Sequence, residues 1–138
     1  MRIAPPIWRL AALAAVIGLV AIAINNMHEK RSREKRNIAY QATLRSYSEV
    51  FKPGMTRKEV EGLLRSRNNV FRQMCCVDIK KSVDVWDDLV KIAQEDAPWF
   101  CSEKNIYIAF QFTGTASRAE PSDKLISVTV YPWLEGCL

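Results

Sequence analysis

The chain contains little of what catalysis or nucleotide chemistry needs. His28 is the only histidine among 138 residues, and one isolated histidine makes neither a catalytic triad nor a metal site. There is no C-x-x-C redox pair, no zinc-ribbon spacing, no phosphate loop and no dinucleotide fingerprint. Internal repeats and low-complexity tracts are also absent. We therefore predict no catalytic residue, no cofactor and no metal ligand.

Two pairs of adjacent acids are the only features that suggest a carboxylate dyad. They are Asp87-Asp88 and Glu95-Asp96. Neighbouring residues on an extended chain point to opposite sides. We therefore interpret both pairs as solvated charge.

The positive charge of the chain is concentrated beside an apolar segment. The net charge is +5, and the residues from Asn37 onward carry 13 bases and 13 acids. The excess therefore lies at Arg2, at Arg9 and in a basic collar, which consists of Lys30, Arg31, Arg33, Lys35 and Arg36. A collar beside a membrane helix attracts anionic headgroups, whereas a nucleic-acid binder carries such charge on its folded domain. We predict contact with membrane lipid and none with nucleic acid.

Residues 3–24 are predicted to cross a membrane once. Leu10 to Ile24 contains no charged or polar side chain, but fifteen helical residues span only about 22 Å of a core of about 30 Å. Including Ile3 to Arg9 extends the helix to about 33 Å. A cleaved signal peptide is the alternative, with Ala21-Ile22-Ala23 as its cleavage site. The collar favours retention, and the lack of a nearby cysteine argues against lipidation. We assign residues 1–27 to the anchor, 28–36 to a basic linker and 37–138 to one small domain.

Two helices are predicted at the start of the domain. In the first, Asn37 to Phe51, four apolar side chains share one face: Tyr40, Leu44, Tyr47 and Phe51. Pro53 and Gly54 end that pattern. The second helix begins after Thr56, which forms a capping box with Glu59, while Met55 and Val60 form a hydrophobic staple. Its buried stripe consists of Val60, Leu63 and Leu64, and Asn68-Asn69 ends it.

Three strands are predicted after the helices, at 70–77, 105–112 and 125–131. The last two alternate clearly, and Ile126, Val128 and Val130 of the last strand are expected on the core side. Residues 78–100 are ambiguous, and we interpret them as an extended or irregular excursion. The predicted fold class is α+β, with two helices packed on a three-stranded antiparallel sheet (α-α-β-β-β) after the transmembrane helix.

The stretch from Phe51 to Ser66 resembles the signature of the SmpA/OmlA (BamE-like) domains and is similar to modules of the β-lactamase inhibitor proteins. The shared turn and helix correspond to Gly54, Met55, Thr56, Val60, Leu63 and Leu64. The resemblance implies two helices on a three-stranded sheet and a non-catalytic protein that binds partners in the cell envelope. The lipidated cysteine of the family's outer-membrane members has no counterpart here. The Leu-Gly step that commonly ends the family helix is replaced by Leu64-Arg65.

We accordingly predict a protein–protein interaction module with no enzymatic activity. Candidate contact residues are Trp99, Tyr107 and Trp133, with Gln111 beside Tyr107, because tryptophan and tyrosine are common interface anchors. The envelope partner is not identified by the sequence. The alternatives are a cysteine-based metal or redox protein and a domain that faces the cytoplasm.

Four cysteines bear on the location of the domain. In an antiparallel meander, Cys75, Cys76, Cys101 and Cys137 converge at one edge of the sheet. We predict that Cys75 and Cys76 pair with Cys101 and Cys137, because a Cys75–Cys76 bond needs a strained vicinal ring. Disulfides persist in oxidising compartments, whereas the positive-inside rule favours a cytoplasmic domain. We predict a single-pass protein of the cytoplasmic (inner) membrane with a periplasmic or otherwise extracytoplasmic domain.

Overall fold

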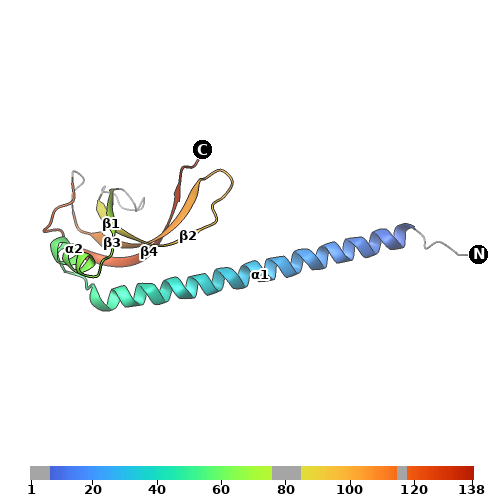
Figure 1. Ribbon diagram of the computed structural model, residues 1–138, viewed down its shortest axis with the longest axis horizontal. Helices are drawn as coiled ribbons and strands as arrows, with labels where there is room; N and C mark the ends of the chain where they lie inside the picture. Colours follow the sequence, from blue (N-terminus) through green and yellow to red (C-terminus); the bar gives the residue numbers. More distant parts are fainter. Residues whose placement is uncertain (1–6, 76–84, 115–117) are drawn as a thin grey trace, which may run out of the picture. The chain divides into compact units, whose positions relative to one another are not determined.

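The computed structural model describes residues 7–75, 85–114 and 118–138, with side chains from residue 11 onward. The chain forms two compact units, Met1–Ala39 and Tyr40–Leu138. Two helices are followed by four strands (Figure 1): α1 (Ile7–Val50), α2 (Arg57–Ser66), β1 (Phe71–Cys75), β2 (Trp86–Glu95), β3 (Glu103–Phe112) and β4 (Leu125–Glu135).

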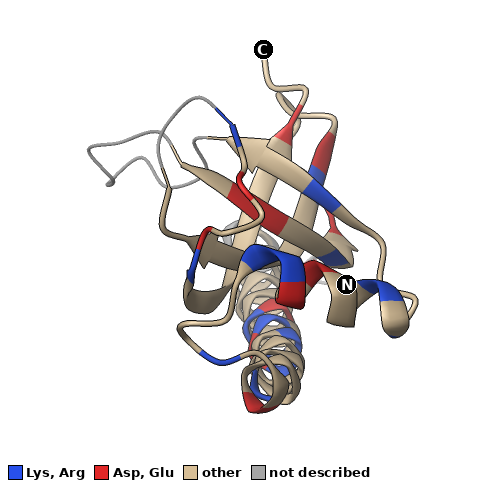
Figure 2. Ribbon diagram, turned by 90° about the vertical axis from the view of Figure 1, so that its left-hand side faces the viewer, with Lys and Arg blue, Asp and Glu red and all other residues tan. Residues whose placement is uncertain are grey.

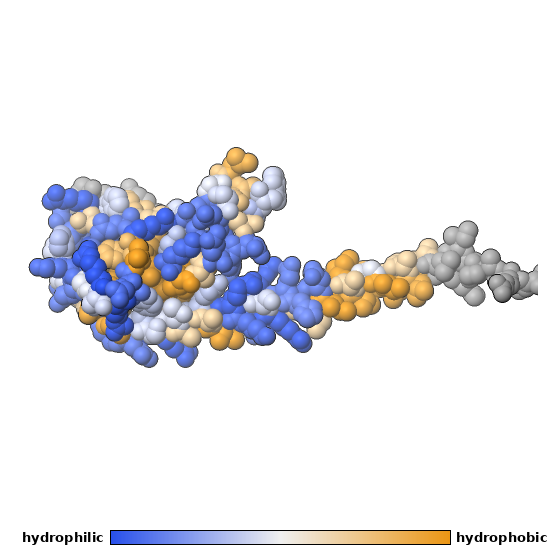
Figure 3. Space-filling model, in the orientation of Figure 1, coloured by the Kyte–Doolittle hydropathy of each residue, from blue (hydrophilic) through white to orange (hydrophobic). Residues whose placement is uncertain are grey.

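Helix α1 is continuous over 44 residues. It includes most of the segment predicted as an anchor, all of the basic linker and nearly all of the first amphipathic helix. The side chains from Ala11 onward through the apolar part are exposed, and Figure 3 shows this apolar band followed by a hydrophilic one. By length and composition, this helix could cross a membrane.

The core of the second unit lies between the helices and the first face of the sheet. Eight buried side chains form it: Phe51, Val60, Leu64, Val90, Ile108, Phe110, Phe112 and Leu125. Leu44 and Tyr47, from the last turns of α1, pack against this cluster. The ring centroids of Phe51 and Phe110 are 4.9 Å apart in an edge-to-face contact, a favourable aromatic geometry. Helix α2 and the last turns of α1 therefore cover the first face of the sheet.

The start of α2 confirms the predicted capping box. The Thr56 hydroxyl accepts a bond from the Glu59 N–H at 3.3 Å, and the Glu59 carboxylate accepts one from the Thr56 N–H at 2.7 Å. Hydrogen bonds from the Thr56 backbone, and then from its side chain, lower the pKa of Glu59. Gly54 has φ +90° in the preceding turn, and Asn68 has φ 57° after the helix. Both positions therefore use residues that tolerate the left-handed region.

We predict that Thr56→Ala lowers the free energy of unfolding by about 1 kcal/mol, because one capping bond is lost. Denaturant titration of the full-length protein in detergent, followed by tryptophan fluorescence, measures the change. Lys58→Ala is the matched control, since Lys58 is exposed on the same turn. Equal stability of the two variants would contradict the capping role.

The sheet has four strands in the order β1-β2-β3-β4, with every neighbouring pair antiparallel. The predicted three-stranded sheet is therefore wrong. The additional strand is β2, which lies inside the segment interpreted as an irregular excursion. Its Leu89 faces Arg72 of β1 and Ala109 of β3.

Strand β2 escaped prediction because both faces of its first half are buried. Asp87 and Asp88 are 1% and 0% exposed, so their interpretation as solvated charge is also wrong. Leu89 and Val90 follow them and enter cores on opposite faces. A strand buried on both sides lacks the polar–apolar alternation that reveals a half-buried strand. Two adjacent acids in such a strand give it the polar sequence that is typical of a loop.

Strand β4 forms one edge of the sheet and contains a bulge. Gln111 pairs with Ser127 and Phe112 pairs with Leu125, so Ile126 is an extra residue. The bulge leaves the Ile126 side chain 49% exposed, which corrects its predicted place in the core; Val128 and Val130 do pack there. Further along the same strand, Pro132 pairs with Ile106.

Candidate functional site

The second face of the sheet carries its own side-chain cluster. Leu89, Tyr107 and Ala109 are buried there, and Met74, Tyr131 and Trp133 pack around them. Among the described elements, α2 and the last turns of α1 pack on the first face. The second face is therefore the place where the strands themselves present side chains to a ligand or partner.

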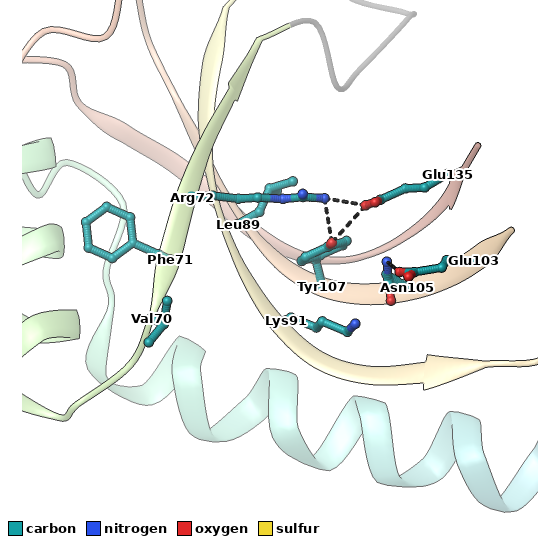
Figure 4. Close-up of a pocket in the computed structure, with 9 residues that line it drawn as sticks. All are labelled: Val70, Phe71, Arg72, Leu89, Lys91, Glu103, Asn105, Tyr107 and Glu135. Atoms are coloured by element: carbon teal, nitrogen blue, oxygen red, sulfur yellow. Dashed lines mark hydrogen bonds and ion pairs between the residues drawn. The ribbon is translucent and has the colours of Figure 1, made fainter. Parts of the chain in front are cut away.

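A pocket of about 260 Å³ opens on this face. Figure 4 shows the residues that line it: Val70, Phe71, Arg72, Leu89, Lys91, Glu103, Asn105, Tyr107 and Glu135. All four strands or their flanks contribute to the lining. Sites for small molecules usually measure roughly 300–1,000 Å³, so this pocket is on the scale of one large side chain.

Arg72, Tyr107 and Glu135 form a closed network at the rim (Figure 4). The guanidinium of Arg72 donates to the Tyr107 hydroxyl at 2.5 Å and forms an ion pair with Glu135. The same hydroxyl donates to Glu135 at 3.0 Å. The guanidinium carbon also lies 4.9 Å from the centroid of the Tyr107 ring. Three strands are therefore joined by one charged network.

The protonation of this network suits binding better than proton abstraction. Burial, and then the hydrogen bond to Glu135, raise the pKa of Tyr107. The hydrogen bond from Arg72 is the largest influence that lowers the pKa of Glu135. Near neutral pH, the tyrosine is a neutral donor and the glutamate is already paired. The network offers fixed hydrogen-bonding groups and no free base.

Mixed charge surrounds the remainder of the pocket. The Lys91 ammonium donates to the side chain of Gln94 at 3.0 Å. The amide nitrogen of Asn105 donates to Glu103 at 2.8 Å, while its buried oxygen has no partner in the described part of the chain. Figure 2 shows acidic and basic segments interspersed over the domain. The pocket therefore suits a ligand that carries both positive and negative groups.

Arg57, Asp88 and Asp123 form a second charged cluster, which is buried beneath α2. The Arg57 guanidinium lies 2.5 Å from Asp88 and 3.4 Å from Asp123, and donates to the Trp86 carbonyl at 2.5 Å. It also lies 4.0 Å from the centroid of Phe112. Arg57 is only 1% exposed. This cluster joins α2 to the sheet and is inaccessible to a ligand.

Burial raises the pKa of Asp88 to about 7, although Arg57 opposes the shift. One Asp88 oxygen and the Trp86 indole nitrogen are buried without a partner among residues 7–75, 85–114 and 118–138. Both groups belong to the interior of the fold. Their unpartnered atoms destabilise the buried cluster, and they carry no evidence for a catalytic carboxylate.

The disulfide pairing differs from the prediction. Cys101 bonds to Cys137, so neither is available to Cys75 or Cys76. This bond belongs to the connectivity that the ring-strain argument disfavoured. Cys75 is also disulfide-bonded, and Cys76 lies outside the described residues. The meander does bring the start of β3 and the end of β4 together, which is why Cys101 and Cys137 meet.

Two of the predicted contact residues, Tyr107 and Trp133, pack in the same cluster on the second face, whereas Trp99 lies elsewhere. Trp99 is 92% exposed in the loop between β2 and β3, whereas Tyr107 is only 3% exposed and lines the pocket. Trp133 is half-buried and lies 5.7 Å from Tyr131, measured between ring centroids. The sequence did not predict Arg72 and Glu135 as site residues, because only the strand register places them beside Tyr107.

The motif that resembles the BamE-like signature, Gly54 to Leu64, forms the turn and the helix start described above and lies outside the pocket. Within the described residues, no three His, Cys, Asp or Glu side chains form a group that could hold a metal ion. No protein family matches the chain, and no curated protein or solved structure is similar to it.

Proposed function

We propose that this chain is a membrane-anchored, non-catalytic protein whose small domain binds another protein through the second face of its sheet. The observation that carries the proposal is the pocket around Arg72, Tyr107 and Glu135. Its volume of about 260 Å³ suits an inserted side chain better than a cofactor. Its fixed donors and acceptors suit the polar backbone of a bound segment.

The apolar part of α1 supports the anchoring half of the proposal. The Cys101–Cys137 bond favours an oxidising compartment for the domain, because thiols in the cytoplasm are kept reduced. An extracytoplasmic domain on the inner membrane is the corresponding topology. Membership of the BamE-like family stays a prediction that rests on the Gly54–Leu64 motif alone.

Site-specific photo-crosslinking in the membranes of the native host tests the partner site. A benzophenone side chain is placed at Val70 or at Lys91, which are both exposed at the pocket. We expect both positions to capture the same protein. Lys58, which is exposed on α2, is the control position and should not capture it.

A disrupting variant makes this test specific. Val70 is 88% exposed, so Val70→Asp should leave the fold intact while it places a charge beside the apolar part of the pocket. We expect the crosslink from Lys91 to fall several-fold in this variant, since a desolvated charge opposes binding. Unchanged capture, or equal capture from Lys58, would exclude the pocket as the partner site.

A further inference from the structure

A second exposed surface lies at the end of the sheet where the β2–β3 loop meets the end of the chain (Figure 1). It consists of Trp99, Phe100, Leu134 and Leu138, which we call the aromatic tip. These side chains are 92%, 40%, 42% and 105% exposed, respectively. Exposed apolar groups that gather in one place usually mark an interaction site.

The aromatic tip is held in a fixed conformation. The Cys101–Cys137 bond crosses it, and the Leu138 N–H donates to the Phe100 carbonyl at 2.9 Å. The Ser102 N–H donates to the Glu135 carbonyl at 3.0 Å. These bonds fix the backbone of the two chain segments beside each other, which lowers the ordering cost on binding.

Close packing at Gly136 limits movement of the two segments. Gly136 has φ +60°, and a Cβ there would lie 2.1 Å from the Ser102 hydroxyl oxygen. Only glycine fits this approach. Trp99 and Phe100 are in edge-to-face contact, with ring centroids 5.8 Å apart, so the exposed rings also support each other.

We propose that the aromatic tip inserts into the headgroup region of a lipid bilayer. Tryptophan is enriched at membrane interfaces, and Trp, Phe and Leu are the side chains that interfacial segments bury there. A bilayer needs no matching pocket, so it fits a protruding aromatic loop better than a protein does.

The apolar part of helix α1, which could cross a membrane by length and composition, supports a bilayer as the occupant. Anchoring also keeps lipid at a high effective concentration. This inference therefore rests on the anchoring half of the proposed function and not on the protein partner.

The charges beside the tip favour neutral headgroups. Lys104 is paired with Glu95 at 2.8 Å, Asp96 is exposed, and Glu103 is bonded to the Asn105 amide. The local excess is therefore acidic, and it repels anionic lipid. Phosphatidylcholine, which has no net charge, is therefore the appropriate probe for the tip. The basic collar, in contrast, attracts anionic headgroups.

The test uses the full-length protein in phosphatidylcholine vesicles whose acyl chains carry bromine, a contact quencher, either near the headgroup or near the chain end. Replacing Trp8, Trp86 and Trp133 with phenylalanine leaves Trp99 as the only tryptophan, which is excited selectively at wavelengths that tyrosine does not absorb. We expect a roughly twofold loss of Trp99 emission with headgroup-proximal bromine, and a smaller loss with deep bromine, for a ring at the interface.

The matched control moves the tryptophan along the same domain. Ile126 is also an exposed apolar residue, at the opposite end of β4 from the tip. In the variant with Ile126→Trp and Trp99→Phe, we expect no quenching by either lipid. Where these multiple variants do not fold, 5-fluorotryptophan in the natural sequence reports the four tryptophans separately by ¹⁹F NMR, with doxyl-labelled phosphatidylcholine as the relaxation agent.

Each outcome decides the proposal. Quenching of Trp99 alone supports it. The proposal is overturned if Trp99 is quenched by aqueous iodide and not by lipid. It is also overturned if Trp99 is shielded from both quenchers, as it would be in a contact with protein. Equal quenching at position 126 also overturns it, because lipid would then contact the domain nonspecifically. Co-flotation with the vesicles reports the anchor separately, so a failed anchor is distinguished from a failed tip.

Discussion

Arg57→Ala should lower the free energy of unfolding by about 3–5 kcal/mol, the usual cost of removing one partner from a buried ion pair. Asp88 is 0% exposed and would lose its cation. Asp123 and the Trp86 carbonyl would lose a donor at the same time. Urea denaturation of the full-length protein in detergent measures the loss.

The matched control for Arg57→Ala is Arg65→Ala on the same helix. Arg65 pairs with Glu61 at 2.7 Å, but its side chain is 66% exposed, and an exposed i,i+4 pair contributes only about 0.3–0.5 kcal/mol. We expect the two losses to differ several-fold. Similar losses would show that the buried cluster does not hold α2 on the sheet.

We expect the free energy of unfolding that is lost in Arg57→Ala to depend on pH. The pKa of Asp88 is already raised to about 7 by burial, and removing Arg57 raises that pKa further. A carboxyl with a raised pKa in the folded state is stabilising in its protonated form, and this contribution is lost as pH rises through the folded pKa. We therefore expect the loss to be smaller at pH 6 than at pH 8.5.

Removal of the Cys101–Cys137 bond should lower the free energy of unfolding by roughly 2–4 kcal/mol, because the bond closes a long loop in the unfolded chain. The two cysteines are 36 residues apart. The double variant Cys101→Ser, Cys137→Ser is compared with the natural sequence without reductant. Non-reduced peptide mapping is the companion measurement. A link from Cys101 to Cys75 or Cys76 would contradict the pairing.

Local interactions made parts of the fold predictable. The turn at Gly54 and the cap formed by Thr56 and Glu59 depend on neighbours within a few residues, so their sequence pattern is sufficient. The alternation of 105–112 places Ile108, Phe110 and Phe112 on the helix-covered face, although Tyr107 and Ala109 are buried on the other face. In each case, the residues that determine the structure lie beside one another in the chain.

The missed features depend on contacts between distant residues. Strand β2 contains two buried acids whose partners are distant in the sequence. Arg57, thirty-one positions before Asp88, pairs with that acid, and the Phe112 N–H donates to Asp87. Arg72 and Glu135 meet across 63 positions, and no periodicity reveals their register. The disulfide pairing required knowledge of a fourth strand, since that strand determines which cysteines share a sheet end.

Pro132 has a consequence for the behaviour of the protein at high concentration. β4 is an edge strand of eleven residues, and a long edge is a template for the addition of strands from other molecules. Proline has no N–H to donate to an incoming strand, and natural proteins place it on edges for this reason. The bulge at Ile126 twists the other end of the same edge. Together these two irregularities leave no long, flat stretch of β4 on which a fibril could grow, so the domain can be concentrated without forming β-aggregates through this edge.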